Sequence, residues 1–386
     1  MREVVIVEAV RSPVGKRQGK LSAMLPVHLA ARVLQALIAR AGIDAALVQD
    51  VVFGCVTPLG DQGANIARLA ALQAGLPAHV PAVTINRMCG SSQQAIHFAA
   101  QEILSGDMDI VIAGGIEMMS RVPLGSDWPQ EWPPDFPYAL IHQGLSAELM
   151  AEKWNLTRSE LDRFAFKSHV KAAAATRRGD FSREIVPIES LGTTPLPGGK
   201  TETLTVDEGI RFEPDLVKMG KLQPAFKPDG VITAGNSSQI SDGAAAVLLM
   251  SADKAAQLAQ SGKPRARLVA RVVVGSDPVL MLAGPIPATR QALDRAGLSL
   301  DDMDAIEINE AFASVVLAWQ KELHPDPARV NPNGGAIALG HPLGATGAVL
   351  MTKLLHHLER IGGRYGLQTM CIGHGMATAT IIERIG

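Results

Sequence analysis

Residues 82–113, AVTINRMCGSSQQAIHFAAQEILSGDMDIVIA, contain the unit that decides the fold of this chain. A short β-rich run at 82–86 precedes an Ala-rich helical stretch at about 91–105, and a second apolar run follows at 110–113. A strand, a helix and a strand in this order are typical of α/β folds with mainly parallel, buried strands. We therefore predict an α/β fold.

The same alternation extends on both sides of this unit. It predicts further strands at residues 4–9 and 50–54 and helices at 27–41 and 64–74. From about residue 120 to 242 it is replaced by Pro- and Gly-rich loops with charged amphipathic helices, notably at 159–178. After Lys263 the alternation returns, which predicts an inserted, less regular domain.

The second half of the chain resembles the first. Two pairs of segments carry the similarity. One pair is Arg40-Ala-Gly-Ile, before a strand at Asp50, and Arg295-Ala-Gly-Leu, before a strand near Asp304. The other pair is Asn86-Arg-Met-Cys-Gly and Asn331-Pro-Asn-Gly-Gly. We predict two similar α/β halves that face each other, with a chance similarity of Ala/Gly-rich segments as the alternative. The predicted domains are residues 1–119, completed by about 243–263, an inserted loop domain at 120–242, and a second half at 264–386.

Composition excludes several classes of protein. The 386 residues carry 36 Lys+Arg and 38 Asp+Glu, without the basic cluster that nucleic-acid binding requires. The chain has no signal-peptide pattern and no run of about 18 apolar residues for a membrane span. Its three cysteines show neither a disulfide framework nor zinc-ligand spacing. We expect a soluble, cytoplasmic globular protein with no metal and with no nucleic-acid or membrane partner.

Cys89 is a candidate nucleophile. The strand at 82–86 delivers it to the expected first turn of the next helix, where free N–H groups and the helix dipole would stabilise a thiolate. A buried, inert cysteine is the alternative.

Two glycine-rich segments near the C-terminus carry further reactive groups. Residues 334–347, GGAIALGHPLGATG, place five glycines around His341 but match neither a P-loop nor a dinucleotide-binding loop. His341 is a candidate general base for a cysteine, with a structural histidine as the alternative. The second segment, Cys371-Ile-Gly-His-Gly, offers another thiol beside flexible backbone donors.

Taken together, these motifs resemble the thiolase family along nearly the whole chain. The main matches are Asn86 to Ile96, Asn309-Glu-Ala-Phe-Ala, Gly334 to Gly347 and the Cys-x-Gly-x-Gly segment at Cys371. Supporting matches are Gln143-Gly-Leu-Ser-Ala-Glu, Pro224-Ala-Phe, Thr233-Ala-Gly-Asn-Ser-Ser, Ser241-Asp-Gly-Ala-Ala-Ala and Gly284-Pro-Ile-Pro-Ala. The resemblance implies a thiolase-like fold, with the two halves in a layered αβαβα arrangement and an inserted loop domain.

The resemblance also implies a reaction. Cys89 would attack the keto carbon of a 3-ketoacyl-CoA after His341 has taken its proton. Cys371 would then protonate the leaving acetyl-CoA enolate and activate the incoming CoA thiol. CoA, a substrate, would release the acyl group from Cys89 in a ping-pong cycle, and no permanently bound cofactor is implied.

Thiolases stabilise two oxyanions with separate donor sets. By resemblance, His341 and a water held by Asn309 would polarise the thioester oxygen of the enolate. The backbone N–H groups of Cys89 and Gly373 would hold the other oxygen. A helix-capping role is the alternative for Asn309.

The insertion is expected to bind CoA. Three positions that line the pantetheine arm in similar proteins match Ser238, Phe226 and Ala225. Three positions that shape the acyl end of the pocket match His142, Met281 and Phe312, with core packing as the alternative. Arg211 and Lys218 match the region that contacts the adenosine-phosphate end, and a solvated charged face is the alternative reading.

Two features of the sequence, a histidine in a glycine-rich motif and an aromatic loop, bear on the choice of substrate. His374 replaces a glycine of the common Cys-x-Gly-Gly-Gly form, so it would tune Cys371, contact substrate or point outward. The loop around Trp128, Trp132, Phe136 and Tyr138 concentrates aromatic residues in an aromatic-poor chain. It would wall an acyl pocket for bulky substrates or pack against a sister subunit.

Three functions remain open. A degradative 3-ketoacyl-CoA thiolase, which shortens acyl chains, is the leading hypothesis. A biosynthetic acetyl-CoA acetyltransferase would use the same residues in the opposite direction. A catalytically idle CoA-binding relative is the third, and it is disfavoured because Cys89, Asn309, His341 and Cys371 are all present. A homodimer or homotetramer is expected.

Overall fold

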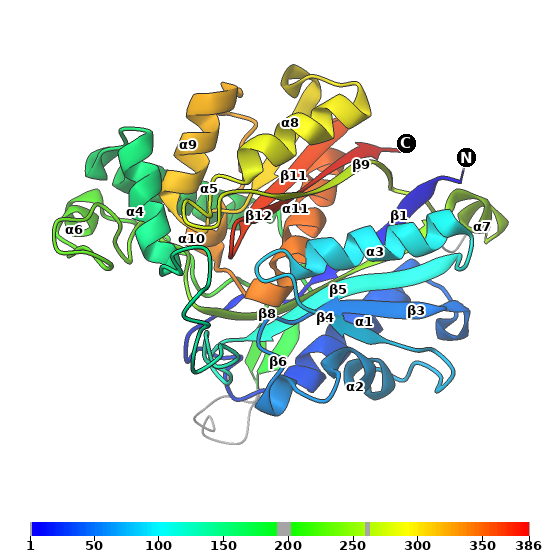
Figure 1. The fold of residues 1–386 in the computed structure, drawn as a ribbon. Coiled ribbons are helices and arrows are strands. Elements are labelled where there is room, and N and C mark those ends of the chain that lie inside the picture. Colours follow the sequence, from blue (N-terminus) through cyan, green and yellow to red (C-terminus); the bar gives the residue numbers. More distant parts are fainter. Residues whose placement is uncertain (1, 191–201, 259–262, 386) are drawn as a thin grey trace.

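In the part of the chain that the structure describes, ten strands form one large sheet (Figure 1). The computed structural model describes residues 2–190, 202–258 and 263–385. The strand order is β10-β11-β12-β9-β1-β8-β5-β3-β4, with β2 paired to β8. The strands are β1 (Val4–Arg11), β2 (Gly15–Lys16), β3 (Asp50–Gly54), β4 (Val83–Ile85), β5 (Ile110–Met118), β8 (Ser241–Ser251), β9 (Ala266–Gly275), β10 (Met303–Ile308), β11 (Tyr365–Ile372) and β12 (Met376–Arg384).

The helices follow capping signals in the sequence. Helix α1 begins at Pro26, whose fixed φ suits the first helical turn. Helix α5 begins after Thr157, which forms a capping box with Glu160. The helices are α1 (Pro26–Ala41), α2 (Ile66–Gln73), α3 (Ser91–Ser105), α4 (Gln143–Lys153), α5 (Arg158–Arg178), α6 (Leu216–Gly220), α7 (Ala252–Gln257), α8 (Pro285–Ala296), α9 (Ala313–Leu323), α10 (Ala336–Leu339) and α11 (Thr346–Ile361).

The sheet is mixed, whereas the alternation of strands and helices led us to expect mainly parallel pairing. Strand β3 runs parallel to β4 and β5, and β10 runs parallel to β11. The other pairings described in this sheet are antiparallel. The link from β11 to β12 gives a physical reason, because a turn as short as residues 373–375 joins only antiparallel strands. The α/β class is confirmed, and the expectation of mainly parallel pairing is wrong.

The two halves of the sheet repeat one arrangement. In the first, β3 runs parallel to β5, β5 antiparallel to β8, and β8 antiparallel to β1. In the second, β10 runs parallel to β11, β11 antiparallel to β12, and β12 antiparallel to β9. Helices α1 and α8 also end alike, at Gly42 with φ 65° and at Gly297 with φ 64°. Glycine adopts this left-handed conformation without strain. The predicted similarity of the two halves is confirmed.

The helices and the two halves of the sheet form five layers (Figure 1). Helices α1 and α2 pack on one half, α8 packs on the other, and α3 and α11 lie between the halves. The middle layer is apolar, since Ile96, Ile103 and Leu354 are completely buried in it. Polar contacts also join it to the sheet; in one of them Gln93 Nε2 donates to Thr380 Oγ1 at 2.7 Å. This contact holds the beginning of α3 against β12, and the layers agree with the expected αβαβα order.

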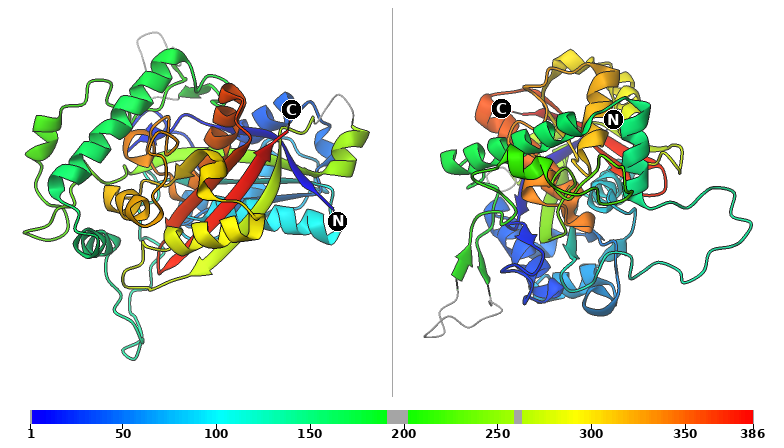
Figure 2. Two further views of the ribbon diagram at one scale, coloured as in Figure 1. Left: turned by 90° about the horizontal axis from the view of Figure 1, so that it is seen from above. Right: turned by 90° about the vertical axis from the view of Figure 1, so that its left-hand side faces the viewer.

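The insertion covers one end of the layered body. Helices α4 and α5 pack against α9 in a shared apolar cluster, and β6 (Ile188–Ser190) pairs with β7 (Glu202–Leu204). Figure 2 shows the loop between β5 and α4 extending away from the body. The domain boundaries stay a prediction, and residues 191–201 and 259–262 lie outside the described part of the chain. No helix in the described ranges is both long enough and apolar enough to cross a membrane.

Candidate active site

Cys89 lies at the junction between β4 and α3. The helix begins at Ser91 with Gly90 as its N-cap, so Cys89 precedes the first turn in which we expected it. The Ser91 hydroxyl shapes this junction, because it donates to Met88 O at 2.6 Å and accepts from Arg87 N–H at 2.9 Å. Only 5% of Cys89 is exposed. Its thiol is therefore held in an apolar wall at the beginning of α3.

Burial controls the protonation of Cys89. It raises the pKa of the thiol to about 11, while hydrogen bonds from the Gly373 N–H, the Cys89 N–H and the Gln143 side chain act in the opposite direction. The expected net stabilisation of the thiolate by the helix end is thus absent from the resting site. Cys89 is a neutral thiol near pH 7, and it needs a base before it can attack.

The His341 ring has a defined tautomer. Its Nδ1 lies 2.6 Å from Thr346 Oγ1, and the Thr346 hydroxyl donates its one proton to Pro342 O at 2.9 Å. In the contact with Thr346, Nδ1 must therefore be protonated and donate to Oγ1. The neutral ring then has its lone pair on Nε2. Burial lowers the pKa of His341 to about 4, so the ring is neutral and Nε2 can accept a proton.

Asn309 is joined directly to this basic nitrogen. Asn309 follows β10, and its Nδ2 lies 3.3 Å from His341 Nε2. Its Oδ1 is buried and has no hydrogen-bond partner among the described residues. The alternative role as a helix cap does not apply, because the N-cap of α9 is Phe312. Asn309 and His341 thus present polar atoms at one buried place.

Cys371 is the second buried thiol. It lies near the end of β11, opposite Ala377 of β12, and is 1% exposed. Burial raises the pKa of this thiol far above its usual range, and the negative charge of an ionised Cys89 raises it further. The two cysteines, one from each half, are therefore close enough to interact electrostatically. The described hydrogen bonds of the His341 ring are with Asn309 and Thr346 rather than with a thiol.

The predicted acyl-end residues are linked by ring contacts and by a shared apolar cluster. The His142 ring stacks on Phe226 with centroids 5.2 Å apart, and Phe226 meets Phe312 edge to face at 6.0 Å. Met281 and Phe312 belong to the same apolar cluster as Cys371. His142, Phe226 and Phe312 therefore form one aromatic group, which reaches the apolar cluster that contains Cys371.

The predicted CoA residues are spread more widely. Ser238 is half-buried, and its N–H donates to Ala311 O at 2.9 Å, close to Asn309 in the chain. Ala225 is bound through its N–H to Ile232 O. Arg211 and Lys218 line a cavity of about 160 Å³ at α6, apart from the catalytic side chains. In the part of the chain that the structure describes, no group of three or more His, Cys, Asp or Glu is placed to hold a metal.

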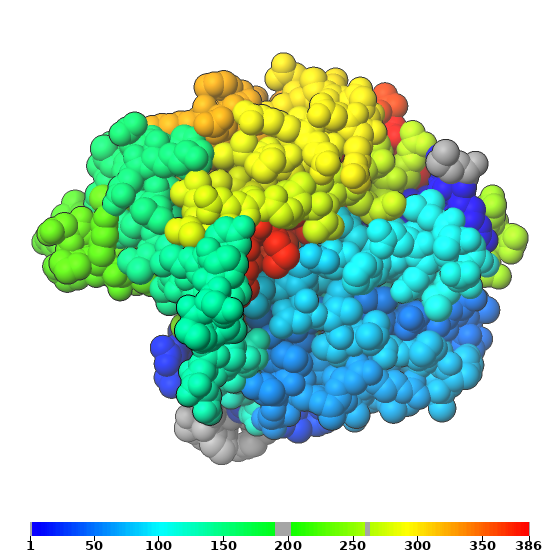
Figure 3. Space-filling model, in the orientation of Figure 1, coloured from blue at the N-terminus to red at the C-terminus, as the bar shows by residue number. Residues whose placement is uncertain are grey.

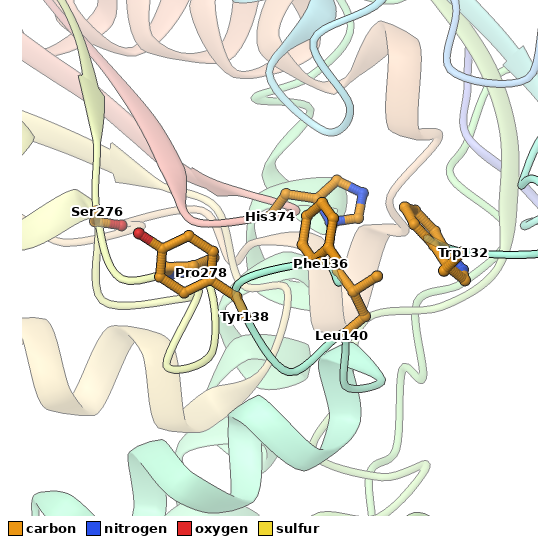
Figure 4. A pocket seen from close by; sticks show the side chains of 7 residues that line it. All are labelled: Trp132, Phe136, Tyr138, Leu140, Ser276, Pro278 and His374. Atoms are coloured by element: carbon orange, nitrogen blue, oxygen red, sulfur yellow. The ribbon is translucent and has the colours of Figure 1, made fainter. Parts of the chain in front are cut away.

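A larger cavity, of about 560 Å³, lies at the turn after β11. Figure 3 shows a segment from the last part of the chain, in red, reaching the surface in a hollow between the teal loop and the yellow segment. The lining residues are Trp132, Phe136, Tyr138, Leu140, Ser276, Pro278 and His374 (Figure 4). Trp128, from the same loop, is not part of this lining and is 44% exposed.

Comparison with known proteins agrees with this geometry. Residues 4–253 match the thiolase N-terminal domain, and residues 262–384 match the thiolase C-terminal domain. The chain belongs to the thiolase family. It is similar to a steroid 3-ketoacyl-CoA thiolase of Mycobacterium tuberculosis, with 50% identity over 100% of this chain and 95% of the relative. Two further relatives, a beta-ketoadipyl-CoA thiolase of Acinetobacter baylyi and a 3-ketoacyl-CoA thiolase of Salmonella typhimurium, are each 43% identical over 100% of both chains.

Two polar residues of this thiolase site have partners that the sequence does not reveal. Gln143 begins α4, far along the chain from Cys89, yet its side chain lowers the pKa of that thiol. Glu117 is completely buried, and its carboxylate accepts from Val56 N–H at 2.8 Å and from Gly344 N–H at 2.9 Å. Glu117 thereby ties the loop of His341 to the first half of the sheet. A charged residue in the otherwise apolar strand IVIAGGIEM was the available signal.

Proposed function

We propose that this enzyme of the acetyl-CoA C-acyltransferase type cleaves a 3-ketoacyl-CoA with CoA, through an acyl-enzyme on Cys89. The products are acetyl-CoA and an acyl-CoA shortened by two carbons. The observation that carries the proposal is the lone pair on His341 Nε2, which lies in one buried site with Asn309. The names of the relatives, which are 3-ketoacyl-CoA thiolases at 43–50% identity, also support it.

The first step forms a bond between Cys89 Sγ and the keto carbon of the substrate. Since burial keeps the Cys89 thiol protonated, His341 Nε2 takes this proton as the thiolate attacks. Negative charge then develops on the former keto oxygen. The N–H groups of Gly373 and Cys89, which hydrogen-bond toward Cys89 Sγ, are well oriented to hold that oxygen.

The second step breaks the bond between the keto carbon and the neighbouring carbon, leaving an acyl group on Cys89 and an enolate of acetyl-CoA. His341 and a water bound to the unpartnered Asn309 Oδ1 would polarise the enolate oxygen. The Cys371 thiol supplies the proton that converts the enolate into acetyl-CoA. The raised pKa of Cys371 suits this role, because it keeps the thiol protonated until a strong base forms beside it.

The third step transfers the acyl group from Cys89 to CoA. The Cys371 thiolate left by the second step takes the proton of the incoming CoA thiol, and the CoA sulfur attacks the thioester on Cys89. Release of acyl-CoA returns both cysteines to their starting state, with His341 giving its proton back to Cys89. The cycle is therefore ping-pong and needs no bound cofactor.

CoA contacts are part of the same proposal. Ser238, Ala225 and Phe226 would line the pantetheine arm, and the cavity between Arg211 and Lys218 would take the adenosine-phosphate end. We also propose a cytoplasmic location, where three free cysteines stay reduced, and a homodimer or homotetramer.

CoA-dependent thiolysis tests this proposal. Purified enzyme is assayed with acetoacetyl-CoA, with medium- and long-chain 3-ketoacyl-CoAs and with a ring-bearing analogue, and Cys89→Ala serves as the control. Preference for longer or bulkier substrates, lost in Cys89→Ala, supports the degradative reaction. Activity confined to acetoacetyl-CoA would favour the biosynthetic acetyltransferase instead. Absence of any turnover would leave a CoA-binding relative without catalysis.

A further inference from the structure

We propose that His374 determines substrate specificity by hydrogen-bonding to a neutral oxygen on the acyl group. This inference rests on the thiolysis proposed above and adds the class of acyl group. Four features of the molecule carry it: the strained backbone of His374, its unpartnered ring, the buried hydroxyl across the cavity, and the absence of cations from the cavity wall.

The backbone at His374 favours glycine over histidine. Its φ is 63°, in the left-handed region that glycine adopts without strain. The turn is also tightly packed, because a Cβ on the neighbouring Gly375 would lie 2.7 Å from Asp277 O. A histidine retained in such a conformation points to a role for its side chain.

The position of His374 couples it to the reacting centre. The preceding residue, Gly373, directs its N–H toward Cys89 Sγ, where the acyl group would be bound. The His374 ring extends from the same turn into the cavity of about 560 Å³, where Trp132 meets it edge to face at 6.3 Å. Such a volume lies within the usual range of small-molecule sites, roughly 300–1,000 Å³. An acyl group on Cys89 would therefore extend past the imidazole into an aromatic cavity.

Two polar side chains of the cavity have no hydrogen-bond partner among the described residues. Among the described residues, no hydrogen bond reaches the His374 ring, and Ser276 Oγ is buried without a partner. Figure 4 shows Ser276 and Tyr138 toward the other end of the cavity from Trp132. A buried hydroxyl without a partner is costly, so a bound ligand that satisfies Ser276 Oγ gains affinity, and the half-buried His374 ring can bond to the same ligand.

The charges around the cavity define the ligand atom. Among the described residues, its wall contains no Lys or Arg, and the loop that contributes Trp132 and Phe136 carries Glu131 and Asp135 in its sequence. A carboxylate would find no cation among the residues that line the cavity, whereas a ketone or hydroxyl oxygen needs only hydrogen-bond donors. The acyl group is therefore bulky enough for an aromatic cavity of about 560 Å³, and it carries a neutral oxygen.

Three 3-ketoacyl-CoAs of matched size test this inference, with an acyl ring that carries no oxygen, a ketone or a carboxylate. We measure kcat/KM for each with wild type, His374→Gly, His374→Asn and, as control, Trp128→Ala. Wild type and Trp128→Ala should prefer the ketone over the plain ring by roughly tenfold, the usual effect of one hydrogen bond. His374→Gly should lose this preference, and His374→Asn, which tolerates positive φ and keeps an amide donor, should retain part of it.

The preference is a ratio measured on one preparation, so partial misfolding lowers both values and leaves the ratio unchanged. A wild type that does not discriminate, one that prefers the carboxylate, or a His374→Gly variant that keeps the ketone preference would each overturn the inference. These outcomes differ from the failure of the proposed function, in which no 3-ketoacyl-CoA is cleaved at all.

Discussion

Thr346 Oγ1 lies 2.6 Å from His341 Nδ1, and the Thr346 hydroxyl donates its own hydrogen bond to Pro342 O. This arrangement assigns the basic lone pair to His341 Nε2. Both residues belong to the glycine-rich loop and the beginning of α11, so the base and the group that orients it move together. A hydrogen bond of this kind positions a catalytic histidine and selects its tautomer.

Removal of the Thr346 hydroxyl should therefore impair catalysis more than binding. For Thr346→Val we expect kcat to fall by about 10- to 100-fold, because His341 loses its acceptor and its preferred tautomer. Steady-state thiolysis assays measure this. Thr352→Val is the matched control, since the Thr352 hydroxyl only bonds to Ala348 O within the same helix. Equal kcat values in the two variants would contradict the assigned tautomer.

The pH dependence of alkylation should report the burial of Cys89. Burial raises the pKa of Cys89 to about 11, so its thiolate fraction should still be rising above pH 9. The rate of reaction with iodoacetamide, followed by peptide mass spectrometry, should climb with pH without a plateau near the usual thiol value of ~8.5. Gln143→Leu removes a hydrogen bond that lowers this pKa, so alkylation should be slower still below pH 11. A plateau below pH 8 in the wild type would rule out the buried neutral thiol.

Glu117 should support both stability and the His341 loop. The Glu117→Gln amide accepts fewer hydrogen bonds than the carboxylate, which accepts from the N–H groups of Val56 and Gly344. The variant should therefore lose about 1–3 kcal/mol of unfolding free energy and have a lower kcat. Urea unfolding and thiolysis measure the two effects. Glu102→Gln is the control, because one Glu102 carboxylate oxygen already lacks a partner. Similar unfolding free energies for the two variants would show that Glu117 does not hold the loop.

The two tryptophans of the aromatic loop should behave differently. Trp132 lines the cavity and contacts Phe136 at 6.0 Å, whereas Trp128 does not line it. Trp132→Ala should lower kcat/KM for ring-bearing substrates relative to acetoacetyl-CoA by about tenfold, while Trp128→Ala should keep the wild-type ratio. Size-exclusion chromatography accompanies the assays. Dissociation of the Trp132→Ala oligomer with an unchanged substrate profile would assign the loop to a subunit contact instead.

Much of the fold could be predicted from local sequence. The paired Arg-Ala-Gly segments at Arg40 and Arg295 predicted two similar halves, and each ends a helix at a glycine in the left-handed conformation. Strand pairing could not be predicted in the same way, because alternation along the chain does not tell which strands become neighbours. Strand β8 illustrates this, since it lies between β1 and β5 although the insertion separates it from both in sequence.

The candidate site was predictable where its residues stand in recognisable motifs, as Cys89, Asn309, His341 and Cys371 do. The pKa of Cys89 could not be predicted from the sequence, because it depends on burial against residues such as Ile372 from the other half of the chain. The contact of Gln143 with Cys89 and the bonds of Glu117 also depend on the tertiary fold. The roles of the four motif residues in catalysis remain a prediction that experiment has to test.

Trapping of the acyl-enzyme tests the central claim most directly. The enzyme is mixed with a 3-ketoacyl-CoA in the absence of CoA, and both the protein mass and the released acetyl-CoA are measured. We predict that the protein gains the mass of one shortened acyl group on Cys89, with one acetyl-CoA released per modified site, and that added CoA removes the group. An unmodified Cys89 in a sample that has released acetyl-CoA would contradict the mechanism.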